Sequence, residues 1–284
     1  MLPEASLRAL AARLSGDPTA PIAFLGEGWD NVVWSVGDDL VLRVRKHGSV
    51  RERAVAVQHD VDLLHFAARH STVATPAVVS VAPFDGAVLT TRVPGVPATE
   101  ARPDLAALAD TLAVLLTALH SVSLEEAAEV VAPDPDPPEE WLRQIGEEYA
   151  EARAHSPADL HPGVEAFLAA APPAAPSRLV FCHNDVRDDH LMVDPDSGAV
   201  TGLIDWGDAV LGDPALDLAT ILTDFGPETY QRVLAGYRVP TEDGLEDRVI
   251  HVARRRMVED LAWRVRTADG PGLARTAAVL RSLL

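Results

Sequence analysis

The chain has 284 residues, 48% of them hydrophobic and 24% charged, which is enough to bury a sizeable core in one large or two-lobed protein and excludes wholesale disorder. Its 24 basic and 43 acidic residues give a formal net charge of −19, and this acidity argues against nucleic-acid binding, which depends on Lys and Arg to neutralise phosphates. The single cysteine, Cys182, and the lack of a leader-like segment or a ~20-residue apolar run predict a cytoplasmic protein without a membrane partner.

Helical and strand-like segments both occur in the first third of the chain. Apolar residues at helical spacing, such as Leu7, Leu10 and Leu14, predict an amphipathic helix near the start. Short apolar runs follow, and two of them flank a Gly-Asp-Asp sequence at 37–39 that suits a hairpin turn. The elements expected here are helices at 5–15 and 54–70 and strands at 22–25, 31–36, 40–45, 78–81 and 87–91.

The clearest boundary signal is the sequence Arg-Val-Pro-Gly-Val-Pro at 92–97, because prolines and a glycine between a strand and a long helical segment favour a connector. The order of the elements predicts an α+β protein with a β-rich lobe over residues 1–93 and a mostly helical lobe over 94–284. The elements expected after the connector are helices at 105–120 and 139–154, a strand at 179–182, a hairpin of 191–193 with 199–204, and only helices after Pro214.

Polar residues are densest in two sequences, His-Asn-Asp-Val-Arg-Asp-Asp-His at 183–190 and Asp-Trp-Gly-Asp at 205–208. They lie at the two ends of one predicted hairpin. Because a hairpin returns its far end to its starting side, we expect Asp205 to lie close to His190 and near the loop that carries Asp185. One or two carboxylates with phosphate oxygens are common ligands of magnesium. Each residue alone is better explained as part of a solvated acidic loop, but together they favour a site.

These segments resemble the catalytic loop and metal-binding segment of the aminoglycoside phosphotransferase-like kinases, a superfamily distantly similar to the protein kinases. The family pattern is His-x-Asp, four residues, a metal ligand, a hairpin and Ile-Asp-x-Gly, and this chain matches it from His183 to Gly207. The sequence Asp-Pro-Ala-Leu-Asp-Leu-Ala at 213–219 resembles a further family segment. Several pieces in the right order are more specific than any one of them. The resemblance covers nearly the whole chain and implies a two-lobed, protein-kinase-like fold.

The resemblance implies roles for the matching residues. Asp185 would orient the substrate hydroxyl as it attacks the γ-phosphate, and Asp205 would bind the magnesium ion that bridges the nucleotide phosphates. His190 takes the second metal-ligand position, where most family members have asparagine, and histidine there resembles the macrolide phosphotransferase branch, as does Trp206. An imidazole binds a divalent ion only through nitrogen, which leaves open whether manganese (Mn2+) is tolerated better than magnesium (Mg2+) or a water molecule intervenes. Asp217 would brace the catalytic loop from behind.

Two segments of the first lobe would contact the nucleotide by the same resemblance. Gly26 and Gly28 resemble the family's nucleotide-covering loop, although a Gly-x-Gly sequence by itself is most often a turn. The linker residues Thr91 and Val93 would offer backbone groups to the purine base. The macrolide-like features make GTP an alternative to ATP, and the nucleotide stays open.

The family also has a lysine on its third strand that holds the α- and β-phosphates. This chain has arginine instead, which can grip phosphate in a bidentate manner. The apolar pattern of the strand assigns the role to Arg43, with Arg45 on the same face as the alternative. The carboxylate partner on the following helix would be Asp60, with Asp62 and Glu52 as alternatives.

The acceptor would bind against the helical lobe, where acidic and aromatic side chains can contact a cationic molecule. Asp208 is the candidate nearest in sequence to the metal-binding segment. Glu259 and Asp260 with Trp263, one helical turn along, form the next group. For each residue alone, a place on the solvated surface of an acidic chain is a strong alternative. The full set of candidates is Asp208, Asp224, Glu147, Glu148, Glu259, Asp260 and Trp263.

The leading hypothesis is a phosphotransferase that moves the γ-phosphate of ATP or GTP to a hydroxyl of a cationic small molecule. An aminoglycoside, a macrolide or a related antibiotic is the leading acceptor, and phosphorylation would give resistance by inactivation. One alternative is a metabolic kinase of the choline or homoserine type, which would have a closed pocket instead of an open acidic cleft. Another is a non-catalytic nucleotide-binding protein, against which the retention of Asp185 and Asp205 argues. We expect a monomer or a weak dimer.

Overall fold

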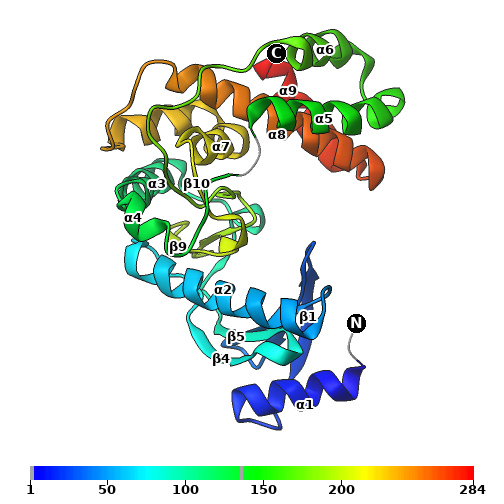
Figure 1. Cartoon of the computed structure of the whole chain (residues 1–284), viewed down its shortest axis with the longest axis vertical. Coiled ribbons are helices and arrows are strands. Elements are labelled where there is room, and N and C mark those ends of the chain that lie inside the picture. The colour runs from blue at the N-terminus through cyan, green and yellow to red at the C-terminus, as the bar shows by residue number, and fades with distance from the viewer. Residues whose placement is uncertain (1–2, 135–136) are drawn as a thin grey trace. The chain divides into compact units, whose positions relative to one another are not determined.

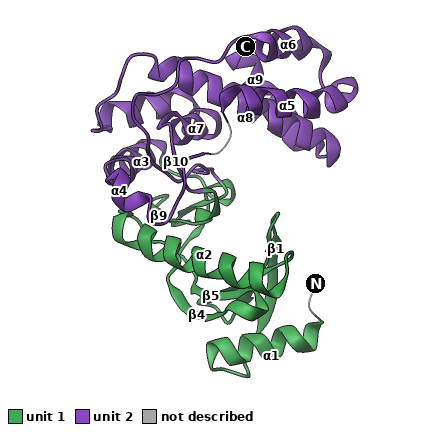
Figure 2. Cartoon of the chain, in the orientation of Figure 1, with its two compact units in different colours: residues 1–104, 189–208 green, residues 105–188, 209–284 purple. Residues whose placement is uncertain are grey.

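The computed structural model describes residues 3–134 and 137–284 and contains two compact units. The first unit comprises Met1–Asp104 and Asp189–Asp208, and the second Leu105–Asp188 and Ala209–Leu284 (Figure 2). This division differs from the predicted lobes, because residues 94–104 and 189–208 belong to the first unit. The reason is strand pairing, since β6 (Val96–Pro97) pairs with β8 (Leu191–Val193).

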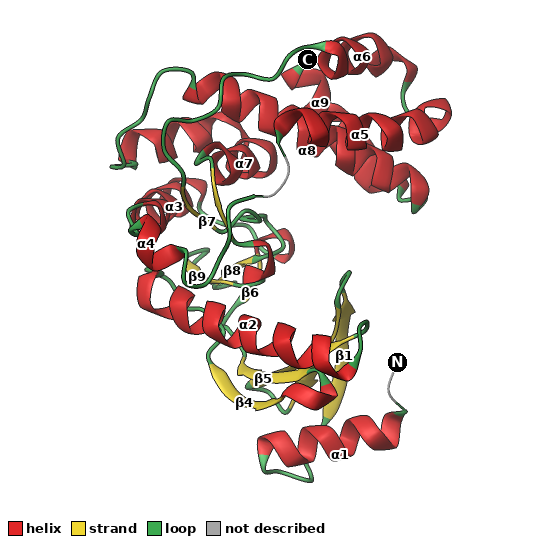
Figure 3. Ribbon diagram, in the orientation of Figure 1, coloured by secondary structure: helices red, strands yellow, loops and turns green. Residues whose placement is uncertain are grey.

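The main sheet of the first unit has five antiparallel strands in the order β1-β2-β3-β5-β4. Strands β1, β5 and β4 are labelled in Figure 3. Leu42 and Val44 of β3 are buried with Leu7 of α1 (Glu4–Ser15) in one apolar cluster. Because successive side chains of a strand point to opposite faces, Arg43 and Arg45 lie on the face away from that cluster. The strands are β1 (Ile22–Glu27), β2 (Asn31–Val36), β3 (Leu40–Arg45), β4 (Val78–Ala82) and β5 (Ala87–Thr91).

Helix α2 (Val50–His70) begins at a capping box. The Ser49 hydroxyl accepts a hydrogen bond from the Glu52 N–H, and the Glu52 carboxylate accepts one from the Ser49 N–H. The helix therefore starts before the predicted residue 54, since the polar sequence Arg-Glu-Arg at 51–53 carries no apolar signal. Its carboxyl-terminal part buries Phe66 and Ala67.

A second sheet of the first unit has the order β6-β8-β9, with β9 at Val200–Leu203. Ala74 forms a parallel bridge to Gly202 at the edge of this sheet. A Cβ atom at Gly202 would lie 2.6 Å from the Ala74 carbonyl oxygen and 2.2 Å from Val93 Cγ1, so this close approach requires glycine. The β8–β9 hairpin is thereby held against the segment before β4 and the segment after β5.

The second unit is mostly helical (Figure 1), and its described residues include a short antiparallel strand pair, β10-β7. Helix α7 packs against α3 and α8, and α8 also packs against α5 and α9. In the described part of the chain, no helix combines the length and the apolar character needed to cross a bilayer. The elements are α3 (Leu105–His120), α4 (Leu124–Ala127), α5 (Pro138–Ala152), α6 (His161–Ala169), β7 (Val180–Cys182), β10 (Val210–Gly212), α7 (Ala215–Gly236), α8 (Leu245–Arg266) and α9 (Gly270–Leu283).

The predicted α+β class is confirmed by the sheets of the first unit and the helices of the second. Strand β10 was not predicted, because its three residues are too few for a periodic signal and its partner β7 lies far back in the sequence. Short 3-10 helices complete the chain, among them η1 (Pro83–Asp85) and η5 (Trp206–Asp208).

Candidate active site

Asp205 lies at the mouth of the β8–β9 hairpin, in the first unit. The Ile204 N–H donates to the His190 carbonyl oxygen at 3.0 Å and closes that mouth. Arg43 Nη2 donates to Asp205 Oδ1 at 3.2 Å, and His190 Nε2 lies 3.8 Å from Asp205 Oδ2. The backbone of Asp205 has a φ of 60°, and the buried Trp206 anchors the chain after it. The expected proximity of His190 and Asp205 is confirmed, and a strained backbone at such a place is typical of functional sites.

The donor atoms at this mouth fit a divalent cation. Asp205 offers a carboxylate that is 48% exposed, and His190 offers a ring nitrogen. Asp189 Oδ1 lies 3.9 Å from the same nitrogen. Carboxylate oxygens suit magnesium and manganese, whereas imidazole is a commoner ligand of transition metals than of magnesium. The residue types therefore fit a site that accepts manganese as well as magnesium.

The ion pair between β3 and α2 involves Arg45 instead of Arg43, which corrects the predicted Arg43–Asp60 pairing. Arg45 Nη2 donates to both carboxylate oxygens of Asp60, at 2.8 and 3.0 Å. Arg45 is the last residue of β3, whereas Arg43, two residues earlier, reaches Asp205. The alternatives to Asp60 are engaged locally, because Glu52 caps α2 and Asp62 accepts a hydrogen bond from Gln58.

Substitution of the two arginines separates these roles. We expect Arg43→Met to weaken nucleotide binding about tenfold, since a charge-assisted hydrogen bond to phosphate is worth about 1.5–3 kcal/mol. Arg45→Met removes a partly buried ion pair and should lower the free energy of unfolding by about 1–2 kcal/mol, with a smaller effect on binding. Calorimetric titration with ATP and GTP and urea unfolding measure the two effects. A greater loss of affinity in Arg45→Met would identify Arg45 as the phosphate ligand.

The predicted nucleotide-covering turn joins β1 to β2. The Gly28 N–H donates to the Asn31 carbonyl at 2.9 Å, and Lys46 Nζ donates to the Gly28 carbonyl at 2.9 Å. A Cβ atom at Gly26 or Gly28 would meet nothing within 4 Å. Packing within the protein therefore does not require glycine at either position, and the open space leaves room for a ligand to approach the backbone.

The two linker residues predicted to contact the base differ in their backbone environment. The Thr91 N–H donates to the Ala77 carbonyl at 2.8 Å, and the Thr91 hydroxyl accepts from the Ala77 N–H at 3.0 Å. The N–H of Thr91 is therefore engaged within the first unit. The backbone contacts of Thr91 and of Val93, whose side chain is buried, with a purine base stay predictions.

Asp185 lies in the second unit, in the loop after β7, and the buried carboxylate of Asp217 holds the residues before it. Asp217 accepts hydrogen bonds from the His183 N–H at 3.1 Å, the Asn184 N–H at 2.6 Å and His120 Nε2 at 3.0 Å. Burial alone would raise the pKa of Asp217, but the hydrogen bonds and the neighbouring histidines hold it below the ordinary value. Asp217 thus remains an acceptor that braces the loop before Asp185.

His120, Cys182 and Asp217 each place a possible metal-ligand atom within 4.8 Å of the others. His120 uses both ring nitrogens, one with Asp217 and the other with the Tyr237 hydroxyl at 2.7 Å. Burial raises the pKa of the Cys182 thiol well above its usual value, and the thiol donates to the Asp213 carbonyl at 3.4 Å. These hydrogen bonds favour a structural network over a metal site.

Asp224 of α7 holds the far end of the same loop. Its carboxylate accepts a hydrogen bond from the Asp188 N–H at 3.2 Å and one from the Thr223 hydroxyl at 2.9 Å. Burial raises the pKa of Asp224 to about 6, although the Arg187 guanidinium, 3.9 Å away, opposes this. A kink in α7 follows at Gly226, whose φ is 85°. Asp224 is therefore a buried loop anchor and not the acidic surface residue that the sequence suggested.

The raised pKa of Asp224 makes stability depend on pH. The folded state holds this proton more tightly than the unfolded chain, so the stabilisation is present at pH values below about 4 and is lost as the pH rises to about 6. Asp224→Asn cannot ionise, and from pH 4 to pH 7 we expect its stability relative to the wild type to rise by about 2 kcal/mol. Urea unfolding at several pH values tests this, with the exposed Asp247→Asn as control. Parallel stability curves for wild type and Asp224→Asn would contradict it.

The predicted acceptor-binding residues fall into different environments. Asp208 lies in η5 of the first unit, and Glu259 and Trp263 are exposed on α8 of the second. The carboxylate of Asp260, also predicted to contact the acceptor, accepts from the Thr276 hydroxyl at 2.6 Å and links α8 to α9. The Arg264 guanidinium lies over the ring of Trp263, 4.7 Å from the ring centroid. Two of the wider set form surface ion pairs, Glu147 with Arg143 and Glu148 with Arg266.

Two arginines of α8 were not among the residues predicted for the site. Arg255 stacks 4.1 Å from the ring centroid of Trp141, and burial lowers its pKa to about 10. Arg256 Nη2 donates to Asn184, the residue before Asp185. The run of three arginines at 254–256 in an acidic chain could have indicated them. Consecutive residues of a helix lie on different faces, so the three side chains cannot all share one solvent-exposed face.

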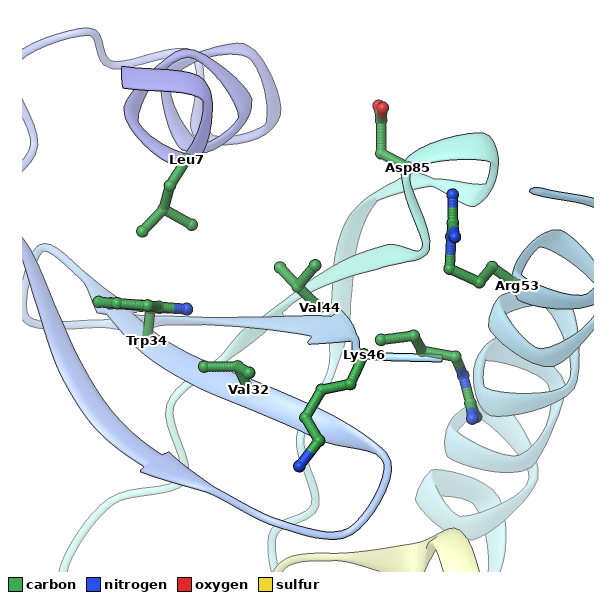
Figure 4. Close-up of a pocket in the computed structure, with 8 residues that line it drawn as sticks. Leu7, Val32, Trp34, Val44, Lys46, Arg53 and Asp85 are labelled. Carbon is green, nitrogen blue, oxygen red and sulfur yellow. The ribbon is translucent and has the colours of Figure 1, made fainter. Parts of the chain in front are cut away.

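The first unit also contains a cavity of about 230 Å³, which is separate from the polar residues at the mouth of the β8–β9 hairpin (Figure 4). Its apolar wall includes Val44 of β3 and Leu7 of α1, which belong to the same buried apolar cluster. Arg43 and Asp205 do not line it, so the cavity is not the candidate nucleotide site. Its lining is Leu7, Val32, Trp34, Val44, Arg45, Lys46, Arg53 and Asp85.

The sequence profile described as "Phosphotransferase enzyme family" matches residues 21–248. The chain belongs to this family. The match confirms the resemblance to the aminoglycoside phosphotransferase-like kinases, and with it the kinase-like fold. A 55-residue segment is also 40% identical to the uncharacterized protein YcbJ of Bacillus subtilis (strain 168), but that match covers only 19% of this chain and 18% of YcbJ.

Solved structures of other proteins share the fold over nearly the full chain. The GDP complex of aminoglycoside 2'-phosphotransferase-IIIa superposes with a TM-score of 0.76 at 20% identity, covering 99% of this chain and 98% of that one. Macrolide 2'-phosphotransferase MphH from Brachybacterium faecium gives 0.66 at 24% identity, with 97% of each chain covered. The streptomycin–ATP–APH(2")-IIa complex gives 0.65 at 16% identity, covering 98% and 97%. At these identities the likeness concerns the fold alone.

Proposed function

We propose that this member of the phosphotransferase enzyme family moves the γ-phosphate of ATP or GTP to a hydroxyl of a small molecule. The observation that carries the proposal is the braced loop of Asp185, whose neighbours His183 and Asn184 are tied to the buried Asp217. Phosphoryl transfer has a loose transition state, so catalysis depends mainly on positioning and on neutralisation of charge. Asp185 would orient the acceptor hydroxyl and accept its proton.

Charge on the nucleotide would be balanced by groups of the first unit. Arg43 is proposed to bind phosphate oxygens, and it is held near its place by Asp205 Oδ1 at 3.2 Å. Asp205 and His190 would hold a divalent cation, Mg2+ or Mn2+, which supplies electrostatic stabilisation of the transferring phosphoryl group when bound. Gly26, Gly28 and Val93 would offer backbone groups to the nucleotide.

The proposed acceptor is a cationic small molecule, with an aminoglycoside, macrolide or related antibiotic as the leading candidate. Support comes from the net charge of −19, which attracts amines, and from the exposed Glu259 and Trp263 on α8. Asp208 remains a further proposed contact. Solved structures of the same fold include complexes with kanamycin, gentamicin and streptomycin. We further propose a monomer or weak dimer and a cytoplasmic location.

A coupled nucleotide-turnover assay tests the proposal. ATP and GTP are supplied in parallel, each with magnesium or manganese, against aminoglycosides, macrolides, cationic peptide antibiotics, choline and homoserine. We expect one antibiotic class to stimulate turnover in the wild type and not in Asp185→Asn. Stimulation by choline or homoserine alone would replace the antibiotic by a metabolic acceptor. Nucleotide binding without stimulation by any acceptor in the panel would contradict the proposed acceptor class.

A further inference from the structure

Asn184, between His183 and Asp185, has a left-handed backbone with a φ of 64°. Residues other than glycine are uncommon in this region, and asparagine is one of the few that adopt it. The Asn184 N–H is held by Asp217 Oδ1 at 2.6 Å. This bond fixes the peptide group before Asn184 but leaves the next peptide group, which leads to Asp185, to be fixed by other residues.

Arg256 of α8 holds that second peptide group. Its Nη2 atom donates to the Asn184 carbonyl oxygen at 2.5 Å and to the Asn184 side-chain oxygen at 2.6 Å. The N–H of the same peptide group, which belongs to Asp185, donates to His183 Nδ1 at 3.2 Å. Both ends of the peptide group that carries Asp185 are therefore hydrogen-bonded within the second unit.

We propose that Arg256 is a positioning residue for Asp185. Arg256 acts through the Asn184 carbonyl: it holds the strained peptide group so that the Asp185 carboxylate is directed by α8, while Asp217 holds the preceding peptide group from α7. This inference rests on the proposed function, because Asp185 needs a fixed direction only if it orients an acceptor.

The chemistry of arginine suits this role better than that of lysine. One guanidinium nitrogen, Nη2, donates to both the backbone and the side-chain oxygen of Asn184. The planar guanidinium is pre-organised for hydrogen bonding, whereas the ammonium of lysine sits on a more flexible stem. Its Nε lies buried without a hydrogen-bond partner among the residues that the structure describes, and burial of an unpaired donor is unfavourable. A hydrophobic side chain of similar length would fill the same space without burying an unpaired donor. Packing alone therefore does not explain an arginine here, which supports a role in holding the loop.

The test compares Arg256→Met and Arg256→Lys with a matched control, Arg254→Met. Arg254 is two residues away on the same helix, and its Nε donates to the Leu283 carbonyl at 2.7 Å, outside the catalytic loop. Amide hydrogen exchange of the full chain reports the order of residues 183–188 without any need for activity. Steady-state kinetics with the best acceptor of the panel, or nucleotide hydrolysis by water if none is found, reports kcat and the nucleotide KM.

We expect Arg256→Met to exchange faster at residues 183–188 while β7 stays protected, and to lower kcat about 100-fold with a nucleotide KM within about twofold. Arg256→Lys should restore part of kcat, and Arg254→Met should behave as wild type. Unchanged exchange in the loop, or an equal loss of kcat in Arg254→Met, would overturn the inference. Faster exchange with unchanged kcat would overturn the positioning role as well. A wild type without any turnover counts against the proposed function, and the exchange result still decides whether Arg256 orders the loop.

Discussion

Asp185→Asn is expected to lower kcat by about 1,000-fold or more and to change the dissociation constant of ATP or GTP by less than about threefold. The amide cannot accept the proton of the acceptor hydroxyl, yet it keeps the size of the carboxylate. The hydrogen bonds that hold the loop come from the backbone of residues 183–185 and from Asp217, Arg256 and His183, so they survive the substitution.

Three measurements check this expectation: turnover with the best acceptor, calorimetric titration of the nucleotide, and thermal unfolding. The unfolding temperature should match the wild type, which separates loss of chemistry from loss of fold. Turnover at the wild-type rate would remove Asp185 from the mechanism. Loss of nucleotide binding together with turnover would assign Asp185 to the nucleotide site instead.

Asp217→Ala is expected to lower the free energy of unfolding by about 3–5 kcal/mol, because the loss of a buried carboxylate leaves its partners unpaired. The orphaned groups would be the N–H groups of His183 and Asn184 and the Nε2 atom of His120. Activity should fall as well, since the N–H of the left-handed residue Asn184 loses the carboxylate that holds it. Urea unfolding at neutral pH measures the loss.

Asp110→Ala is the matched control, because Asp110 forms an exposed ion pair with Arg232, and exposed pairs add little to stability. Asp217→Asn keeps one acceptor oxygen and should lie between Asp217→Ala and the wild type. The lowered pKa of Asp217 means that its contribution is present above the unfolded-state value near 4 and disappears as the pH falls below it. A loss in Asp217→Ala no greater than in Asp110→Ala would show that the loop is braced by other groups.

Local features of the site followed from the sequence. Strand β3 and helix α3 have the predicted bounds, because their apolar patterns are continuous and end at turn residues. His190 and Asp205 lie together because a short hairpin joins them. The spacing from His183 to Gly207 indicated the family, and the family profile confirmed it.

Contacts between distant residues were predicted less well. Asp60 was chosen correctly as the carboxylate of α2, but its partner is Arg45. Both arginines lie on one face of β3, and the sequence has no information on which of them is closer to the helix. Asp260 and Asp224 look alike in the sequence, as acidic residues of helices, yet one binds Thr276 and the other anchors the catalytic loop.

The sequence by itself determined the α+β class, the hairpin that joins His190 to Asp205, and the family, since each depends on periodicity or spacing along a short stretch of chain. Only the tertiary structure decided which arginine pairs with Asp60, that residues 189–208 belong to the first unit, and that Arg256 reaches Asn184. A hydrogen bond between residues 72 positions apart depends on how α8 packs in the second unit. That packing is set by apolar contacts that many sequences could make, so the pairing cannot be read from local pattern.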